Sequence, residues 1–115
     1  MLKTLLTGFA LMALLMVSTA AHAGQAPGEI VWVDVRSAEE YAAGHVAEAA
    51  NIPHTEIVER IGEVTDDKDA TLYLYCRSGR RSGIAATALE EAGFTNVSNI
   101  GGLQDAREKA GSLND

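Results

Sequence analysis

Apolar positions after residue 29 fall into short segments that polar and glycine-containing turns separate. Residues 30–35 and 71–75 are almost continuous runs of β-branched, aromatic and leucine side chains, which is typical of strands buried on both faces. Residues 95–100 predict a weaker strand. Residues 49–53 predict a brief extended segment, because Pro53 disfavours helix just before it. The pattern therefore contains four candidate strands.

Helical patterns lie between these strands. Ser37 and Glu40 have the spacing of a capping box, in which a hydroxyl caps the helix and a carboxylate three residues on reaches back. This box starts a short helix that we expect to end at Gly44. Further helices are expected at residues 54–61, 82–92 and 103–110, with Gly101 and Gly102 as a turn before the last helix. Strands alternating with helices predict a single α/β domain with a mostly parallel central sheet flanked by helices.

The first 23 residues differ in composition from the rest of the chain. Lys3 supplies a positive start, residues 5–17 are almost wholly apolar, and small residues then lead to Ala21-His22-Ala23. This is the three-part pattern of a secretory signal peptide, with cleavage expected after Ala23. The apolar stretch is shorter than the roughly 20 residues that span a bilayer. An uncleaved N-terminal anchor is the alternative interpretation.

We therefore expect a signal peptide at 1–23, a linker at 24–29, one folded domain at 30–110 and a frayed tail at 111–115. Export would place the mature protein in the periplasm or outside the cell. Its formal charge would be more negative than the −7 of the whole chain, and acidic proteins repel nucleic acid and anionic membranes. We expect neither as a partner after cleavage, and the sequence carries no signal for a particular oligomeric state.

Cys76 is the only cysteine of the chain, and it directly follows the strand predicted at 71–75. Parallel sheets bind ligands beyond the carboxyl ends of their strands, so Cys76 is expected at the functional edge of the sheet. A single cysteine in an exported protein implies either an intermolecular partner or a reactive thiol.

The segment after Cys76 combines positive charge with a permissive backbone. It contains Arg77, Ser78, Gly79, Arg80, Arg81, Ser82 and Gly83. A helix N-terminus, inward-pointing amides and guanidinium charge would each lower the pKa of the thiol, and the same groups would hold an anion. Two alternatives are a buried inert cysteine and a phosphate-binding turn in which Cys76 is incidental. The arginines disfavour the first of these.

Three ordered motifs resemble the rhodanese family of sulfurtransferases. Residues 33–53, VDVRSAEEYAAGHVAEAANIP, are similar to its N-terminal signature, and CRSGRRS (residues 76–82) to its active-site loop. NIGGLQDA (residues 99–106) is similar to its C-terminal Gly-Gly segment. The resemblance covers residues 31–104, and the signal peptide and small size are similar to the exported, single-domain rhodaneses of the phage-shock group.

The sequence departs from the family pattern at two positions. Glu48 stands where family members often have glycine, so we expect backbone strain if this position needs a positive φ. Ala106 stands where they often have tryptophan, so we expect a more loosely packed last helix. Neither departure touches the Cys76 segment.

The resemblance implies a ping-pong transfer of sulfur through a covalent intermediate. The Cys76 thiolate would take the outer sulfur of thiosulfate, release sulfite and pass the sulfur from its persulfide to cyanide or a thiol. The implied partners are a small anionic donor and a thiophilic acceptor, without cofactor or metal. Amides from Arg77 to Ser82 would stabilise the developing charge. Arg77 and Arg81 would be the main anion contacts, with Arg80 steering at the rim.

Other polar residues have structural interpretations. Asp34 and Arg36 follow the first strand, and we expect them to form an ion pair or loop brace that supports the site. His45 and His54 are expected to be structural, because no cysteine, histidine or carboxylate cluster has the spacing of metal ligands.

Three other functions compete with sulfur transfer to a small acceptor. A cysteine phosphatase or arsenate reductase uses Cys-x₅-Arg, whose arginine clamps an oxyanion, but that position is Ser82 here and Arg81 falls one residue early. A non-catalytic binding domain commonly loses the cysteine or the loop glycines, and both are present. A persulfide carrier that serves a partner protein would use the same Cys76 chemistry, so it stays open.

Overall fold

The computed structural model describes residues 29–114. The predicted signal peptide (1–23), most of the predicted linker (24–29) and Asp115 lie outside the described residues. None of the helices in the described part is long and apolar enough to cross a membrane. The elements in chain order are β1 (Ile30–Asp34), α1 (Ala38–Ala42), β2 (Ala50–Asn51), η1 (His54–Glu56), α2 (Ile57–Arg60), η2 (Ile61–Glu63), β3 (Thr71–Cys76), α3 (Arg80–Glu91), β4 (Val97–Gly102) and α4 (Leu103–Leu113).

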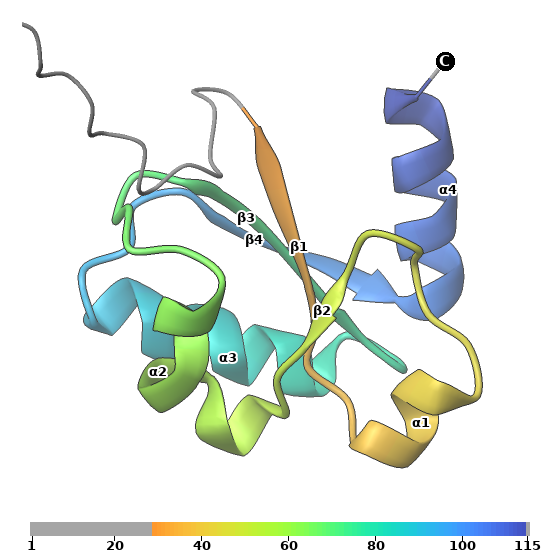
Figure 1. Ribbon diagram of the computed structural model, residues 1–115, viewed down its shortest axis with the longest axis horizontal. Coiled ribbons are helices and arrows are strands. Elements are labelled where there is room, and N and C mark those ends of the chain that lie inside the picture. Colours follow the sequence, from red (N-terminus) through yellow and green to blue (C-terminus); the bar gives the residue numbers. More distant parts are fainter. Residues whose placement is uncertain (1–28, 115) are drawn as a thin grey trace, which may run out of the picture.

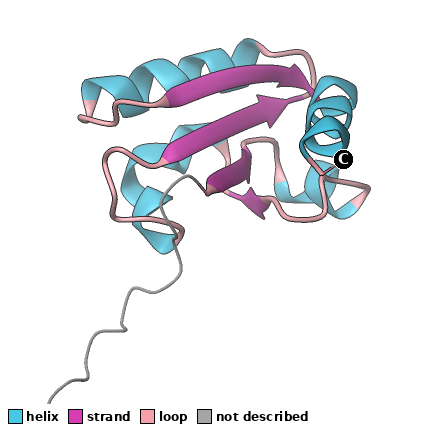
Figure 2. Ribbon diagram, turned by 90° about the horizontal axis from the view of Figure 1, so that it is seen from above, coloured by secondary structure: helices cyan, strands magenta, loops and turns pink. Residues whose placement is uncertain are grey.

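Within residues 29–114, four strands form one parallel sheet in the order β2-β1-β3-β4 (Figure 1). The central strands β1 and β3 are the two continuous apolar runs, and Val33 of β1 pairs with Leu74 of β3. Parallel neighbours need crossover connections, which the helices supply. This confirms the predicted α/β fold with a parallel sheet flanked by helices (Figure 2).

Side chains alternate between the two faces of the sheet, and each face has its own core. Leu72, Leu74 and Cys76 of β3 belong to a cluster that α2 and α3 cover, whereas Tyr75 belongs to a second cluster that contains Ala106 of α4. The period of two along a strand explains this division. Cys76 therefore faces α3, and Tyr75 faces α4.

Several boundaries differ from the predicted ones. α3 begins at Arg80 rather than residue 82, because Gly79 has a φ of +97° and ends the preceding loop. Gly101 and Gly102 are not a turn, since they extend β4 beside Tyr75 and Cys76 after a register shift. The helix expected at 54–61 is divided into η1, α2 and η2.

The C-terminal helix also differs from the prediction. The tail expected to fray from residue 111 is helical through Leu113. Ala106 is fully buried in the cluster of Trp32 and Tyr75, so α4 is closely packed at this position rather than loosely packed. Glu48 lies in an exposed turn, and the strain expected there stays a prediction.

Candidate active site

Cys76 is the last residue of β3, at the carboxyl edge of the sheet, where it pairs with Gly102 of β4. Three loop residues separate it from the start of α3. Only 1% of Cys76 is exposed. The predicted position at the carboxyl edge of the sheet is confirmed, and the residue is buried there.

Hydrogen-bond donors of the loop point toward this sulfur. The Gly79 N–H donates to Sγ over 2.9 Å, and the Ser82 Oγ lies 3.5 Å from it. Burial raises the pKa of Cys76, whereas hydrogen bonds from the Ser82 hydroxyl and from the amides of Ser82, Ser78 and Gly79 lower it. The hydrogen bonds together outweigh burial, and the pKa is about 7. The sulfur is therefore buried among donors, which distinguishes it from an inert core cysteine.

We expect the alkylation rate of Cys76 by iodoacetamide to rise with a midpoint near pH 7. The thiolate is the reacting form, and a lowered pKa makes it the major form above that pH. The same chain unfolded in urea is the control, with a midpoint near the usual value of about 8.5. Equal midpoints for folded and unfolded chains would show that the loop donors do not act on the sulfur.

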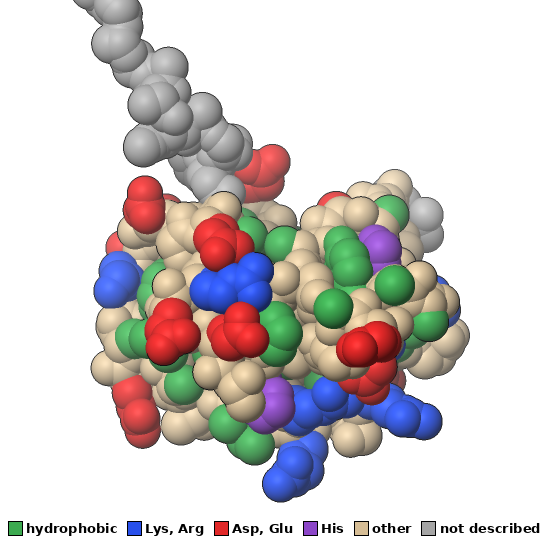
Figure 3. Space-filling view, turned by 60° about the horizontal axis from the view of Figure 1, so that its bottom comes forward, with side chains coloured by type: hydrophobic (Ala, Val, Ile, Leu, Met, Phe, Trp, Pro, Cys, Tyr) green, Lys and Arg blue, Asp and Glu red, His purple; other side chains and the backbone are tan. Residues whose placement is uncertain are grey.

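The three arginines that follow Cys76, one in the loop and two in the first turn of α3, differ in their surroundings. Arg77 and Arg80 are exposed, and Figure 3 shows Lys and Arg side chains gathered at one edge of the molecule beside a histidine. Arg81, by contrast, forms a bidentate ion pair with Glu40 over 2.9 and 3.0 Å. Arg81 was expected to be a main anion contact, but a carboxylate already occupies its guanidinium.

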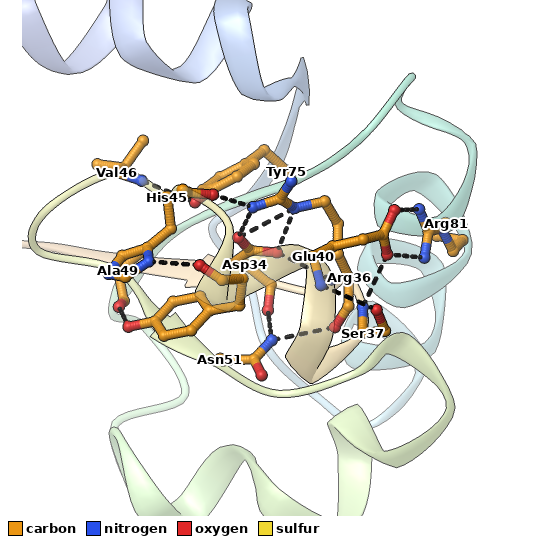
Figure 4. Close-up of polar contacts among 12 residues, drawn as sticks. Asp34, Arg36, Ser37, Glu40, His45, Val46, Ala49, Asn51, Tyr75 and Arg81 are labelled. Atoms are coloured by element: carbon orange, nitrogen blue, oxygen red, sulfur yellow. Dashed lines mark hydrogen bonds and ion pairs between the residues drawn. The ribbon is translucent and has the colours of Figure 1, made fainter.

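Glu40 connects α1 with the first turn of α3, directly after the Cys76 loop (Figure 4). Its carboxylate accepts from the Ser37 N–H and from the Arg81 guanidinium. Arg81, followed by the backbone of Ser37, lowers the pKa of Glu40 to about 2. The capping box was read from the sequence, but the second role of Glu40 was missed. Its place four residues before Gly44-His45 in the family's N-terminal signature was the one available signal.

Asp34 and Arg36 form the predicted ion pair, which is almost entirely buried. The Arg36 Nε and Nη2 donate to the carboxylate of Asp34, and Nη2 also donates to the Gly44 carbonyl over 2.7 Å. The Asp34 side chain is fully buried and Arg36 is 6% exposed. The guanidinium also lies over the ring of Tyr75, 5.6 Å from its centroid, so the pair braces the end of β3 next to Cys76.

The Gly-Gly segment lies directly against the Cys76 loop. A Cβ at position 102 would come within 2.5 Å of the Arg77 carbonyl oxygen. Gly101 has a φ of +113°, which L side chains rarely adopt. Glycine at these positions therefore allows β4 to approach the loop closely, a role that the sequence did not indicate.

Asn99 of β4 is a further site residue that sequence analysis missed. Its Oδ1 lies 2.6 Å from the Ser82 Oγ, and its Nδ2 donates to the Gly79 carbonyl over 2.9 Å. Ser82 is fully buried. Its place as the first residue of the Gly-Gly segment, two positions before Gly101, was the available signal.

The two histidines within residues 29–114, His45 and His54, do not form a common site. The His45 ring stacks on Tyr41 at 3.6 Å between centroids, and its Nδ1 contacts the Tyr41 carbonyl. His54 begins η1. Among residues 29–114, no three His, Cys, Asp or Glu side chains are grouped as potential metal ligands.

Comparison with known proteins assigns this arrangement to a family. The rhodanese-like domain family matches residues 18–109. The chain belongs to the rhodanese family. The thiosulfate sulfurtransferase PspE of Escherichia coli is 49% identical over 74 residues, which cover 64% of this chain and 71% of PspE. A rhodanese from E. coli solved with anions has a TM-score of 0.65 and 47% identity, with coverage of 67% of this chain and 91% of that structure.

Two other relatives share less of their length with this chain than PspE does. A sulfurtransferase of Allochromatium vinosum is 35% identical over 74 residues, covering 64% of this chain and 67% of the relative. The putative sulfur carrier protein YrkF of Bacillus subtilis is 37% identical over 68 residues, covering 59% of this chain but 36% of YrkF. The names of these relatives support sulfur transfer as the general chemistry of this rhodanese.

We expect Gly102→Ala to destabilise this rhodanese domain by about 1–3 kcal/mol, the usual cost of overpacking. The added methyl group meets the backbone of Arg77, which cannot rotate away as a side chain would. The matched control is Gly111→Ala, where nothing lies within 4 Å of the added carbon. This exposed helical site should gain about 0.5–1 kcal/mol. Urea unfolding measures both, and similar shifts in the two variants would contradict the close approach.

Proposed function

We propose that this chain is a thiosulfate sulfurtransferase that carries sulfur as a persulfide on Cys76. The observation that carries the proposal is the 2.9 Å hydrogen bond from the Gly79 N–H to the Cys76 Sγ. It belongs to a set of donors that holds the pKa of Cys76 at about 7 despite burial. A thiolate prepared in this way needs no separate general base.

Sulfur transfer then takes two displacement steps. The Cys76 thiolate attacks the outer sulfur of thiosulfate, and the sulfur–sulfur bond of thiosulfate breaks with its electron pair leaving on sulfite. The new bond makes a Cys76 persulfide, whose terminal sulfur carries the negative charge. Cyanide attacks that terminal sulfur and leaves as thiocyanate, and the electron pair returns to Cys76 as the thiolate. Loop amides of residues 77–82 stabilise the charge in both steps.

The enclosure of Cys76 favours a small donor. With 1% of the residue exposed, a bulky ester would have to displace the loop before reaching the sulfur. Arg77 and Arg80 are the exposed arginines that attract an anion, while Glu40 neutralises Arg81. At the position where a Cys-x₅-Arg phosphatase loop has its clamping arginine, this chain has the fully buried Ser82. These features support thiosulfate over a phosphate ester.

The test is intact-mass spectrometry of the protein after incubation with thiosulfate. We expect the gain of one sulfur atom, and we expect cyanide to remove it with release of thiocyanate. Phosphatase turnover without any sulfur gain would overturn the proposal.

A persulfide carrier is the second candidate. The similarity to the putative sulfur carrier protein YrkF favours it, and the chemistry at Cys76 would be the same. Transfer to a partner protein much faster than to cyanide or small thiols would favour the carrier.

The sequence pattern of residues 1–23 further supports export with cleavage after Ala23, which the N-terminal sequence of the protein from cells would test.

A further inference from the structure

The Ser82 hydroxyl has two competing hydrogen-bond acceptors. A hydroxyl carries one proton, yet the Ser82 Oγ lies 2.6 Å from the Asn99 Oδ1 and 3.5 Å from the Cys76 Sγ. Ser82 is fully buried, so bulk water does not replace either acceptor. The proton can serve one acceptor at a time.

The amide of Asn99 cannot turn away from this competition. The Gly101 N–H donates to its Oδ1 over 3.0 Å, and its Nδ2 donates to the Gly79 carbonyl over 2.9 Å. A backbone N–H only donates and a carbonyl only accepts, so these two contacts determine which end of the amide is oxygen. Oxygen therefore faces Ser82.

The better acceptor depends on the charge of Cys76. When the sulfur is a thiol, its S–H can donate to the Ser82 Oγ while the hydroxyl donates to Asn99 over the shorter distance. When the sulfur is a thiolate, it is a charged acceptor and attracts the same proton more strongly. Moving the proton to the sulfur breaks the bond to Asn99.

We propose that Asn99 is a positioning residue that competes with the Cys76 thiolate for the hydroxyl proton of Ser82 and thereby limits how strongly the loop stabilises the thiolate. A thiol whose pKa matches the ambient pH is the best attacking group, since nucleophilicity falls as the pKa falls further. Asn99 would keep Cys76 in that range. The proposal deepens the proposed sulfur transfer, because it rests on Cys76 as the reacting thiol, but it does not depend on the donor.

The charged groups around Cys76 are largely paired or distant from this exchange. Arg81 is paired with Glu40 and Arg36 with Asp34, and Asp105 of α4 accepts from the Gly102 N–H. Arg77 and Arg80 are exposed.

Strand β4, which provides the Asn99 contact to Ser82, carries no ionisable side chain. A change at position 99 to alanine therefore leaves the charges of the site unchanged.

The experiment is a double-mutant cycle on the pH midpoint of alkylation by iodoacetamide, a neutral reagent. Asn99→Ala should lower the midpoint by about 0.5–1 pH unit, the equivalent of one neutral hydrogen bond. In a Ser82→Ala background the same change should bring no such lowering, because no hydroxyl proton remains to be released. Asn96→Ala is the matched control, because the Asn96 side chain donates a hydrogen bond to the Thr71 hydroxyl at the other end of the sheet.

The proposal is tested by the difference between the midpoint shifts that Asn99→Ala causes with serine and with alanine at position 82. If Asn99 only braces the loop through Gly79, Asn99→Ala shifts the midpoint equally with serine or alanine at position 82, and the proposal is overturned. If Asn99→Ala does not fold, Asn99→Asp is used instead. The carboxylate of Asp holds the hydroxyl proton of Ser82 more strongly than the amide does. The alkylation midpoint of Asn99→Asp should therefore rise more with serine at position 82 than with alanine. An equal rise in both backgrounds would overturn the proposal too. Persulfide formation is measured in a separate experiment. A failed alkylation cycle would therefore overturn the role of Asn99 and not the proposed sulfur transfer, and a failed persulfide measurement would overturn the sulfur transfer and not the role of Asn99.

Discussion

Replacement of Cys76 by serine is expected to lower the proposed thiosulfate:cyanide sulfurtransferase activity by about 10³-fold or more, as removal of a covalent nucleophile typically does. A serine hydroxyl is not ionised near neutral pH, and the loop donors cannot make it a comparable nucleophile. The variant should also show no mass gain with thiosulfate. The measurements are thiocyanate release and intact mass, on protein whose far-UV circular dichroism matches the unchanged chain.

The position of Cys76 makes this substitution a clean test. The side chain is buried at the end of β3 and serine differs from it by one atom, so the sheet pairing with Gly102 should persist. Sulfur bound to the serine variant, or residual turnover close to that of the unchanged chain, would show that another group carries the sulfur.

The second large effect is expected for Arg36→Leu, which should lower the free energy of unfolding by about 3–5 kcal/mol. The substitution leaves the fully buried carboxylate of Asp34 without its partner, and small domains have only about 5–15 kcal/mol of stability in total. Guanidinium chloride unfolding measures the change. Adding Asp34→Asn should recover part of the loss, because the uncompensated charge is removed.

Arg60→Leu is the control for this prediction. Arg60 also pairs with two carboxylates, those of Glu56 and Glu63. In this cluster more than a third of the surface of each side chain is exposed to solvent. Exposed pairs contribute little, because water solvates their charges well. Comparable losses in the Arg36 and Arg60 variants would mean that burial of the Asp34–Arg36 pair does not matter.

The Glu40–Arg81 pair reduces the uncompensated positive charge near Cys76. The sequence places three arginines within six residues of Cys76, which suggests a strongly positive pocket. Because Glu40 pairs with Arg81, the uncompensated positive charge of this segment lies on Arg77 and Arg80 at the surface. The donors nearest the sulfur are instead the amide of Gly79 and the hydroxyl of Ser82.

Local features of the sequence predicted a large part of the fold and the centre of the site. The continuous apolar runs marked β1 and β3, because burial on both faces requires apolar side chains at every position. The end of β3 placed Cys76 at the carboxyl edge of the sheet. The capping box of Ser37 and Glu40 and the ion pair of Asp34 and Arg36 involve residues two or three positions apart, so their chemistry is visible in the chain itself.

Tertiary structure alone decided which distant groups meet around the sulfur. Glu40 reaches Arg81 across 41 positions, and Asn99 reaches Ser82 across 17. Gly102 meets Arg77 because β4 lies beside β3 and continues through a register shift. Hydrophobic periodicity reports which face of an element is buried, but not which element covers it or in what register. The order of strands and the packing of helices determine those contacts, and with them the surroundings of Cys76.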